Sequence, residues 1–315
     1  MPIFHRTTAI AMPQKAGMQG IWEQIEAAAR TCYRSEGKTQ YNENGDSITA
    51  EQFAQKIVRV YKHRSVAEHA TVYLTINGAE GENMLLIKRY KGNKFSRVVS
   101  KYDKESDRFI YYITSNMRVL IENKWEDDLK YMTEPTVYHE RRRTVRLFTD
   151  RGVSAESNRH RCQSPTERST RFVNYSKDDA LTICAPSEYS DEDIELCINE
   201  WGGWQTVFKR MCLAIGRDGG EWFSMLDAWL FGNMAAEWSY MKLIDAGQTP
   251  QQARRILPMD VETELVITAY EDDWVEYFNQ RYYGTTGQPH PDMKEAAYSI
   301  MNAFIDVGWF IPDEK

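Results

Sequence analysis

The sequence predicts an α+β fold in which a modest central sheet is covered by helices and the C-terminal half is mostly helical. Three observations support this fold class. Short β-rich runs are concentrated in the first half of the chain, and apolar residues recur at three- and four-residue intervals in the second half. No internal repeat or interdomain linker divides the sequence. We therefore expect a single domain over residues 1–315, with an insertion around residues 77–107.

The first half is expected to alternate between strands and helices. Short alternating or β-rich runs predict strands at Ile3–Met12, Thr71–Ile76, Phe109–Ile113 and Arg143–Thr149. Helices are predicted at Gly20–Arg34, from the capping box at Thr49 to about Lys62, and after Ser115 to about Met132. Polar turns are predicted at Asn42–Ser47 and Asp150–Gly152, with a short helix from about Ser154. The insertion is interpreted as carrying a hairpin.

The second half has helical periodicity nearly throughout. Helices are predicted at Asp191–Ile215, Trp222–Ala246, Pro250–Leu257, Val261–Gln280 and Pro291–Gly308. Gly247 is suited to ending one of them, and Thr249 followed by Pro250 is suited to starting the next. The helical layer of the fold is therefore expected to come mainly from this half.

The composition excludes several classes of protein. With 42% hydrophobic and 27% charged residues, the chain has the balance of a globular protein. No segment approaches the roughly 20 apolar residues of a membrane helix, and the N-terminus lacks the layout of a signal peptide. The five cysteines are scattered without a C-x-x-C pair, which argues against a disulfide scaffold and a zinc site. We expect a cytoplasmic protein without a metal or a membrane contact.

Positive charge is concentrated in one stretch of an acidic chain. The net charge is −7, yet nine arginines and only three acidic residues lie between Arg141 and Arg171. The central run, Arg159–Phe172, combines arginines with a histidine, serines and a glutamate. Guanidinium groups bind phosphate in a forked geometry, and hydroxyl and backbone N–H groups add donors. The pattern favours a nucleotide site, and an exposed basic surface laced with salt bridges is the alternative.

The same run resembles the signature of the flavin-dependent thymidylate synthases. Arg159-His160-Arg161 is followed by seven residues and Ser169, and Glu167 and Arg171 match further positions of the signature. Segments 63–69 (HRSVAEH), 148–154 (FTDRGVS), 253–258 (ARRILP) and 274–281, together with His290, are also similar to the family. The resemblance covers Ala29–Ala297 apart from the insertion.

The resemblance implies the flavin-dependent thymidylate synthase fold and a specific chemistry. Such enzymes bind dUMP, FAD, NADPH and methylenetetrahydrofolate, and they form homotetramers whose active sites combine residues from several chains. Reduced flavin supplies the hydride that turns the transferred methylene group into a methyl group. No enzymic thiol adds to the uracil ring, so Cys162 is not expected to be a nucleophile although it lies in the signature.

The resemblance also implies roles for individual residues. The dUMP contacts would be Glu156, Arg159, Glu167, Ser169, Arg171, Arg254 and Arg281. Arg281 would be the catalytic cation, because a fixed positive charge beside the pyrimidine stabilises the ring as it loses its N3 proton. The FAD contacts would be His63, Ser65, Glu68, Arg159, His160, Arg161 and His290.

Several positions depart from the family pattern. Thr166 replaces the usual Asn or Gln, and residues 282–289 form a small insertion. Where the family often has Asn-x-Arg before a tryptophan, this chain has Tyr270 and Asp272. An anion then stands where a cation would help to hold the dinucleotide. Because this changes the local charge by two, flavin binding or the cofactor requirement is expected to differ from that of the family.

Three functions remain open at this stage. The first is synthesis of dTMP from dUMP. The second is folate-dependent hydroxymethylation of dUMP or dCMP, which needs no net hydride and would tolerate an altered flavin site. The third is a non-catalytic nucleotide or RNA binder, which the net charge of −7 and the lack of a second basic stripe count against. The expected partners are therefore dUMP, a folate and further copies of the chain, and no nucleic acid.

Overall fold

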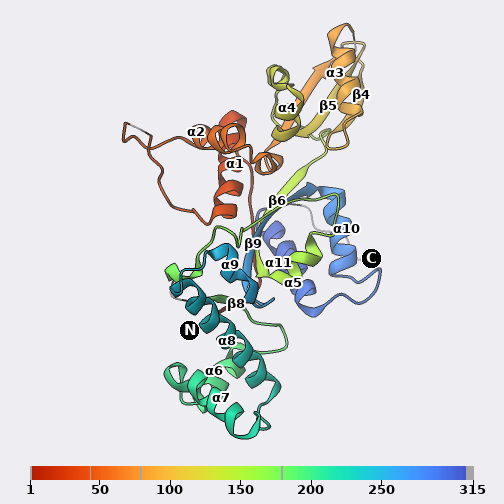
Figure 1. Ribbon diagram of the computed structural model, residues 1–315. Coiled ribbons are helices and arrows are strands. Elements are labelled where there is room, and N and C mark those ends of the chain that lie inside the picture. The colour runs from red at the N-terminus through yellow and green to blue at the C-terminus, as the bar shows by residue number, and fades with distance from the viewer. Residues whose placement is uncertain (1, 43, 79, 179, 310–315) are drawn as a thin grey trace.

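The computed structural model describes residues 2–42, 44–78, 80–178 and 180–309. Figure 1 shows an elongated molecule in three parts: a central sheet with helices on both sides, an upper lobe built around a second sheet, and a lower helical lobe. The predicted α+β class, with a modest central sheet covered by helices, is confirmed.

The central sheet is antiparallel and has four strands. Their order is β2 (Thr8–Ala11), β6 (Arg142–Asp150), β9 (Glu262–Tyr270) and β7 (Ser164–Glu167). Every residue of β9 is buried, because the strand has neighbours on both edges and helices on both faces. It is the structural centre of the molecule.

The two faces of β9 differ in chemistry because successive side chains of a strand point in opposite directions. Leu265 and Ile267 pack into an apolar core with helices on one side. Those helices are α5 (Arg151–Ser157), α10 (Glu271–Arg281) and α11 (Pro291–Asp306). Glu264 and Thr268 lie on the opposite face, which is covered by α1 (Gly17–Tyr33). A polar, charged layer is thus buried between α1 and the sheet.

The prediction of one helix over Val261–Gln280 is wrong. The first half of that segment is β9, and only α10 is helical. The strand contains the β-branched run Val266-Ile267-Thr268, which favours an extended backbone. A strand that is buried on both faces lacks a clean apolar–polar alternation, so its apolar spacing can resemble that of a helix. The nominally helical half of the chain therefore supplies the central strand.

Local signals in the first half locate most elements correctly. α1 and the capping box at Thr49 are confirmed, and the latter opens α2 (Ala50–Gln55), which continues as a π-helical turn over Lys56–Val60. The predicted strands appear as β3 (Thr71–Asn77), β5 (Arg108–Asn116) and β6. In the turn predicted at Asn42–Ser47, Glu43 lies outside the described residues, and a bridge joins the flanking Tyr41 and Ser47.

Three boundaries in the first half differ from prediction. The segment Ile3–Met12 is split into β1 (Ile3–His5), which pairs in parallel with β8 (Thr182–Cys184), and β2 in the central sheet. Asn116, not Ser115, caps α4 (Met117–Asn123), and a separate 3-10 helix covers Glu126–Tyr131. Asp150 is no turn residue but the N-cap of α5, because its side chain accepts from the Val153 N–H.

Residues 77–107, which the sequence analysis predicts to be an insertion, belong to the upper lobe. They contain α3 (Glu82–Lys91) and β4 (Arg97–Asp103). The segment carries only one strand of a hairpin, because β4 pairs with β5, which follows the segment. The hairpin and β3 make an antiparallel sheet in the order β3-β5-β4. The helix α3 was not predicted from the sequence. Its polar sequence concealed a buried face formed by Leu86, Ile87 and Tyr90.

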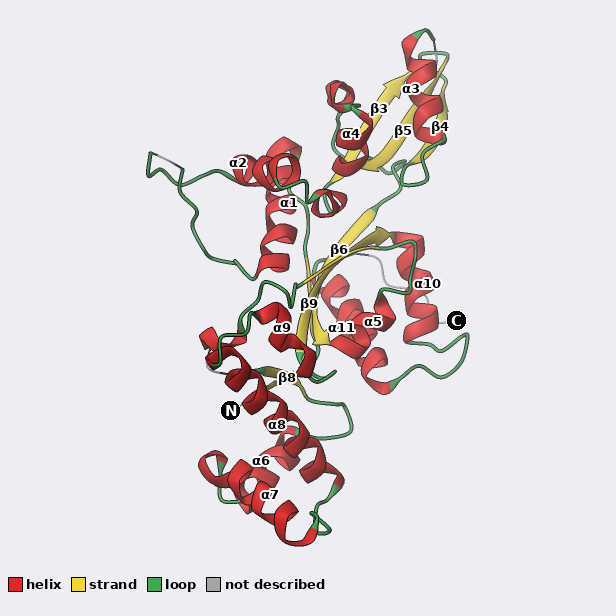
Figure 2. Cartoon of the chain, viewed as in Figure 1, coloured by secondary structure: helices red, strands yellow, loops and turns green. Residues whose placement is uncertain are grey.

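The lower lobe is helical (Figure 2). It contains α6 (Asp191–Glu200), α7 (Trp204–Asp218) and α8 (Met225–Asp245), after which α9 (Pro250–Ala253) and a 3-10 turn (Arg254–Ile256) lead back to the central sheet. The single helix predicted at Asp191–Ile215 is broken at Gly202 and Gly203, where φ is 91° and 78°, in the left-handed region that glycine favours. None of the described helices is long and apolar enough to cross a membrane.

Candidate active site

The signature residues lie on both sides of strand β7. The chain leaves α5 at Ser157, turns through Arg159–Arg161 and forms β7 against β9. After Glu167 it passes α1 and α9, where the N–H of Ser169 donates to the Cys32 carbonyl at 3.0 Å. The first half of the signature is therefore placed beside α10 and the second half beside α1.

Arg281, at the C-terminal end of α10, contacts two other residues of the predicted site. Its Nε donates to Nε2 of His160 at 2.8 Å, and its Nη1 donates to Oε2 of Glu156 at 3.1 Å. The ring of Tyr277 packs edge-on against His160, with the ring centroids 4.8 Å apart. These contacts fix the direction of the guanidinium group, which is what a cation needs to stabilise charge that develops at one place.

His160 is neutral in this arrangement. Burial and the Arg281 guanidinium lower the pKa of His160 to about 4. Because Nε2 accepts from Arg281, the ring proton resides on Nδ1. His160 therefore positions Arg281 at neutral pH without adding a second positive charge.

Glu167 and Ser169 form the other predicted half of the substrate site. The Thr263 hydroxyl donates to Oε1 of Glu167 at 2.9 Å, which orients the half-buried carboxylate. Burial and the neighbouring Glu167 raise the pKa of Cys32 to about 11, so this thiol is protonated. The second oxygen of Glu167 can accept from an N–H or O–H group of a ligand.

Three arginines of the predicted substrate site keep their charge available for an anion. Arg171 donates to the Gln251 side chain at 3.3 Å, Arg254 donates to the Thr170 hydroxyl at 3.2 Å, and Arg159 is exposed. No carboxylate in the described part of the chain forms an ion pair with any of the three. An unpaired guanidinium is what binding of a phosphate requires.

The predicted dUMP contacts thus form two groups within one chain. Glu156 and Arg281 lie where α5 meets α10, and Glu167, Ser169 and Arg254 lie where β7 meets α1 and α9. Within the described ranges, no side-chain hydrogen bond or ion pair joins the two groups.

The predicted FAD contacts are dispersed. His63 bonds to the Tyr33 hydroxyl at 3.1 Å, and Ser65 lies in a 3-10 helix over Arg64–Glu68. His290 lies 3.6 Å from an Asp292 carboxylate oxygen and lines a cavity of about 210 Å³ that Glu156 also borders. Glu68 and Arg161 share a different cavity, of about 300 Å³. The predicted flavin residues are therefore distributed over several surfaces of one chain.

The cavity shared by Glu68 and Arg161 fits part of a phosphate-bearing cofactor. Buried Gln163 lines it, and the Gln163 Nε2 has no hydrogen-bond partner among the described residues. A buried donor without a partner, beside arginine, suits a ligand with acceptor oxygens. FAD is larger than this cavity, so one chain would enclose only a portion of it.

Cys162 is not arranged as a nucleophile. It is exposed beside this cavity, where burial and the Asp273 carboxylate raise the pKa of its thiol. A reactive cysteine needs a lowered pKa, which a neighbouring cation or helix N-terminus would provide. This agrees with the chemistry expected from the sequence.

The departure at Thr166 has a structural partner in His69. Nδ1 of this buried histidine bonds to the Thr268 hydroxyl and Nε2 bonds to the Thr166 hydroxyl, both at 2.8 Å. Burial, aided by Arg142, lowers the pKa of His69 to about 3. Threonine at position 166 thus completes a neutral bridge between β7, β9 and the turn that contains Glu68.

His69 should make the protein sensitive to mild acid. Unfolded His69 takes up a proton as the pH falls through about 6.5, whereas the folded side chain stays neutral down to about 3. The contribution of neutral His69 to the free energy of unfolding is therefore fully present above pH 6.5 and is lost as the pH falls toward 3. Between pH 7 and pH 5 the expected loss is about 2 kcal/mol.

The measurement is urea unfolding of the wild type and of His69→Gln at both pH values. Glutamine keeps a donor and an acceptor but does not titrate. The variant should be less sensitive to pH than the wild type by about that amount. Equal losses of unfolding free energy in the two proteins would contradict the role given to His69.

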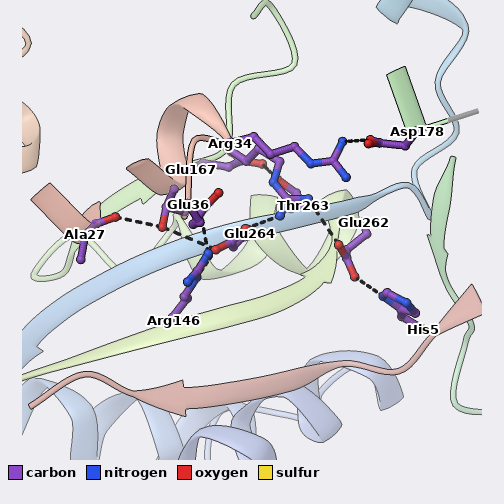
Figure 3. Close-up of polar contacts among 12 residues, drawn as sticks. His5, Ala27, Arg34, Glu36, Arg146, Glu167, Asp178, Glu262, Thr263 and Glu264 are labelled. Atoms are coloured by element: carbon purple, nitrogen blue, oxygen red, sulfur yellow. Dashed lines mark hydrogen bonds and ion pairs between the residues drawn. The ribbon is translucent and has the colours of Figure 1, made fainter. Parts of the chain in front are cut away.

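Sequence reasoning missed Arg168, although it lies within the signature. It is buried, and it pairs with Glu264 and, at 3.3 Å, with Glu262. Figure 3 shows this network extending to Arg146, Glu36 and His5. Arg168 therefore supports the sheet and is not a free anion ligand. The alternation of Glu262 and Glu264 would have indicated one face of a strand, but the helix predicted over this segment hid it.

A comparison with known proteins identifies the family. The sequence profile described as Thymidylate synthase complementing protein matches residues 17–142 and 136–307, which confirms the family resemblance. No curated protein sequence was found to match the chain.

Solved structures with low similarity include two relevant proteins. A UMP/dUMP methylase PolB from Streptomyces cacaoi, bound with 5-Br dUMP, is 12% identical with a TM-score of 0.38, and the match covers 96% of this chain and 92% of that chain. Thymidylate Synthase X from Helicobacter pylori, with FAD and dUMP, is 12% identical with a TM-score of 0.37, and the match covers 94% and 92% of the two chains. These scores are low, so the assignment depends on the sequence match.

Proposed function

Because this chain belongs to the family of thymidylate synthase complementing proteins, we propose that it is a flavin-dependent thymidylate synthase. It converts dUMP to dTMP, with methylenetetrahydrofolate as the carbon donor. When bound, FAD reduced by NADPH supplies the hydride that completes the methyl group. The observation that carries the proposal is the orientation of Arg281 by His160 and Glu156 beside the signature.

In this proposal the chain's own residues bind the nucleotide and polarise its base. Arg159, Arg171 and Arg254 provide the positive charge that holds the 5′-phosphate. Arg281 faces the pyrimidine, so that negative charge is stabilised as N3 loses its proton and carbon 5 becomes nucleophilic. Glu167, oriented by the Thr263 hydroxyl, accepts from an N–H or O–H group of the nucleoside.

We also propose a homotetramer in which neighbouring subunits complete each site. The support is that one chain holds the predicted contacts in two separate groups and encloses only part of a flavin dinucleotide.

We propose a cytoplasmic location as well. The five described cysteines are all unpaired, which fits a reducing cytoplasm.

The second candidate is folate-dependent hydroxymethylation of dUMP or dCMP. It is favoured by Asp272, which stands where the family has a cation for the dinucleotide and is ion-paired with Arg97. A reaction without net hydride transfer does not depend on reduced flavin, so it would survive a weakened flavin site.

Product analysis separates the two candidates. The protein is incubated with dUMP or dCMP, methylenetetrahydrofolate, FAD and NADPH, and the nucleotide is analysed by mass spectrometry. We expect dUMP to gain a methyl group, and the gain to disappear when FAD or NADPH is omitted. A hydroxymethylated nucleotide formed without NADPH would establish the second candidate instead, and an unchanged nucleotide in every mixture would refute both.

A further inference from the structure

The insertion forms one wall of the cavity that contains Glu68 and Arg161. Lys94 and Phe95, in the turn after α3, and Arg97, at the start of β4, line this cavity of about 300 Å³. The opposite wall includes Arg161 and Ser164 of the signature. The upper lobe that carries α3 and β4 lies above the central sheet and α10 (Figure 1). Residues of the segment predicted to be an insertion therefore reach the signature.

Arg97 attaches the insertion to the start of α10. Its Nη1 lies 2.6 Å from an Asp272 carboxylate oxygen and 2.7 Å from one of Glu140, and its Nη2 lies 3.2 Å from one of Asp273. Its guanidinium carbon lies 3.8 Å from the centre of the Tyr270 ring. One cation thus meets three carboxylates and an aromatic face, an arrangement that is stronger than an isolated surface pair.

Both departures from the family's Asn-x-Arg are accounted for by this contact. Tyr270 provides the ring under Arg97, and its hydroxyl donates to the Phe95 carbonyl at 3.4 Å and to the Thr114 carbonyl at 3.1 Å. Asp272 provides the carboxylate nearest to Arg97. An arginine at position 272 would instead repel Arg97 and detach the insertion.

Lys94, Arg142 and Arg161 line the cavity without an ion pair to a carboxylate in the described ranges. Buried Arg142 donates to the Glu68 carbonyl and the Thr71 hydroxyl, which leaves Lys94 and Arg161 for a ligand. Lys94 lies over the Phe95 ring at 4.8 Å. Glu68 is paired with Arg118, and Asp272 and Asp273 are both paired with Arg97. The unpartnered Nε2 of buried Gln163 adds a hydrogen-bond donor to the same cavity. The groups of the cavity that remain available to a ligand are thus two cations and a hydrogen-bond donor, which suit a phosphate group.

We propose that the insertion is part of the cofactor site: the Arg97–Asp272 ion pair docks it on α10, and Lys94 then binds the diphosphate of FAD together with Arg161. The inference rests on the proposed function, which supplies the dinucleotide. Lys94 takes over the charge that an arginine at position 272 would have given. Arg97 is a positioning residue, because its guanidinium is occupied by carboxylates and acts through Lys94.

Binding of FAD, measured by quenching of flavin fluorescence, tests the proposal without relying on turnover. Lys94→Glu reverses an exposed charge beside the diphosphate, so the dissociation constant for FAD should rise about tenfold or more. Arg97→Asp should weaken FAD binding similarly, because four carboxylates would then repel one another and release the insertion. The double variant Arg97→Asp with Asp272→Arg rebuilds the ion pair in reverse and should recover most of the lost affinity.

Two controls make the outcome specific. Lys104→Glu makes the same charge change in the β4–β5 turn of the same lobe and should leave FAD binding unchanged. Affinity for dUMP, measured by calorimetry, should be unchanged in every variant. Unaltered FAD binding by Lys94→Glu, a reversed pair that recovers no affinity, or a parallel loss of dUMP binding would overturn the inference while leaving the proposed function in place. A wild-type protein that binds dUMP but not FAD would overturn both the inference and the flavin-dependent reaction.

Discussion

Substitution of Arg281 by alanine should lower kcat for nucleotide methylation by about 1,000-fold. The guanidinium of Arg281 is held by the neutral His160 ring and by Glu156, so its charge is oriented before the reaction begins. A group that is already oriented needs little reorganisation when negative charge develops on the pyrimidine. Removing it therefore raises the free energy of the transition state more than that of the bound substrate. The reaction is measured by mass analysis of the nucleotide in single-turnover experiments with saturating dUMP.

The affinity for dUMP distinguishes this role from general damage. Arg159, Arg171 and Arg254 are available for the phosphate, so Arg281→Ala should change the dissociation constant for dUMP far less than it changes kcat. Arg281→Lys keeps the charge but not the forked geometry and should recover only part of the rate. An alanine variant with full turnover, or one that loses dUMP binding and kcat in equal measure, would show that Arg281 is not the catalytic cation.

Local signals in the sequence were sufficient for many elements. The amphipathic pattern of α1, the capping box at Thr49 and the helix start at Thr249 and Pro250 depend on residues a few positions apart, and the structure contains all three. The sequence did not predict strand β9, because burial on both faces removes the apolar–polar alternation that identifies a strand. Glu262 and Glu264 lie on the same face of this strand, where both pair with Arg168, a residue that lies far from them in the sequence.

The candidate site was located by the signature but could not be assembled from it. The signature indicates residue types, and it does not show that Arg168 points into the sheet. The contact between Arg97 and Asp272 joins positions 175 residues apart and depends on how the insertion folds back onto α10. In the sequence, Asp272 indicates only the loss of a cation from the cofactor site. The structure shows that Asp272 forms an ion pair with Arg97.

Glu264→Ala is expected to destabilise the protein by about 3–5 kcal/mol. Glu264 is completely buried in the central strand, where Arg146 and Arg168 both donate to its carboxylate. Without it, buried Arg168 keeps only the longer contact to Glu262. Because burying an uncompensated charge is more costly than losing a surface ion pair, the effect should exceed that of most single substitutions. Urea unfolding at pH 7 measures the change.

Glu36 provides the matched control, because it also pairs with Arg146 but its side chain is 33% exposed. Glu36→Ala should cost no more than about 1 kcal/mol. The Glu264 carboxylate holds the Arg168 guanidinium immediately before Ser169 and Arg171, so this ion pair helps to set the path of the chain as it leaves β7. Glu264→Ala should therefore weaken dUMP binding as well as stability, although residue 264 is buried away from solvent. Similar unfolding free energies for the Glu264→Ala and Glu36→Ala variants would contradict the stability given to the buried pair. Unchanged dUMP binding by Glu264→Ala would show that the pair does not hold the second half of the signature in place.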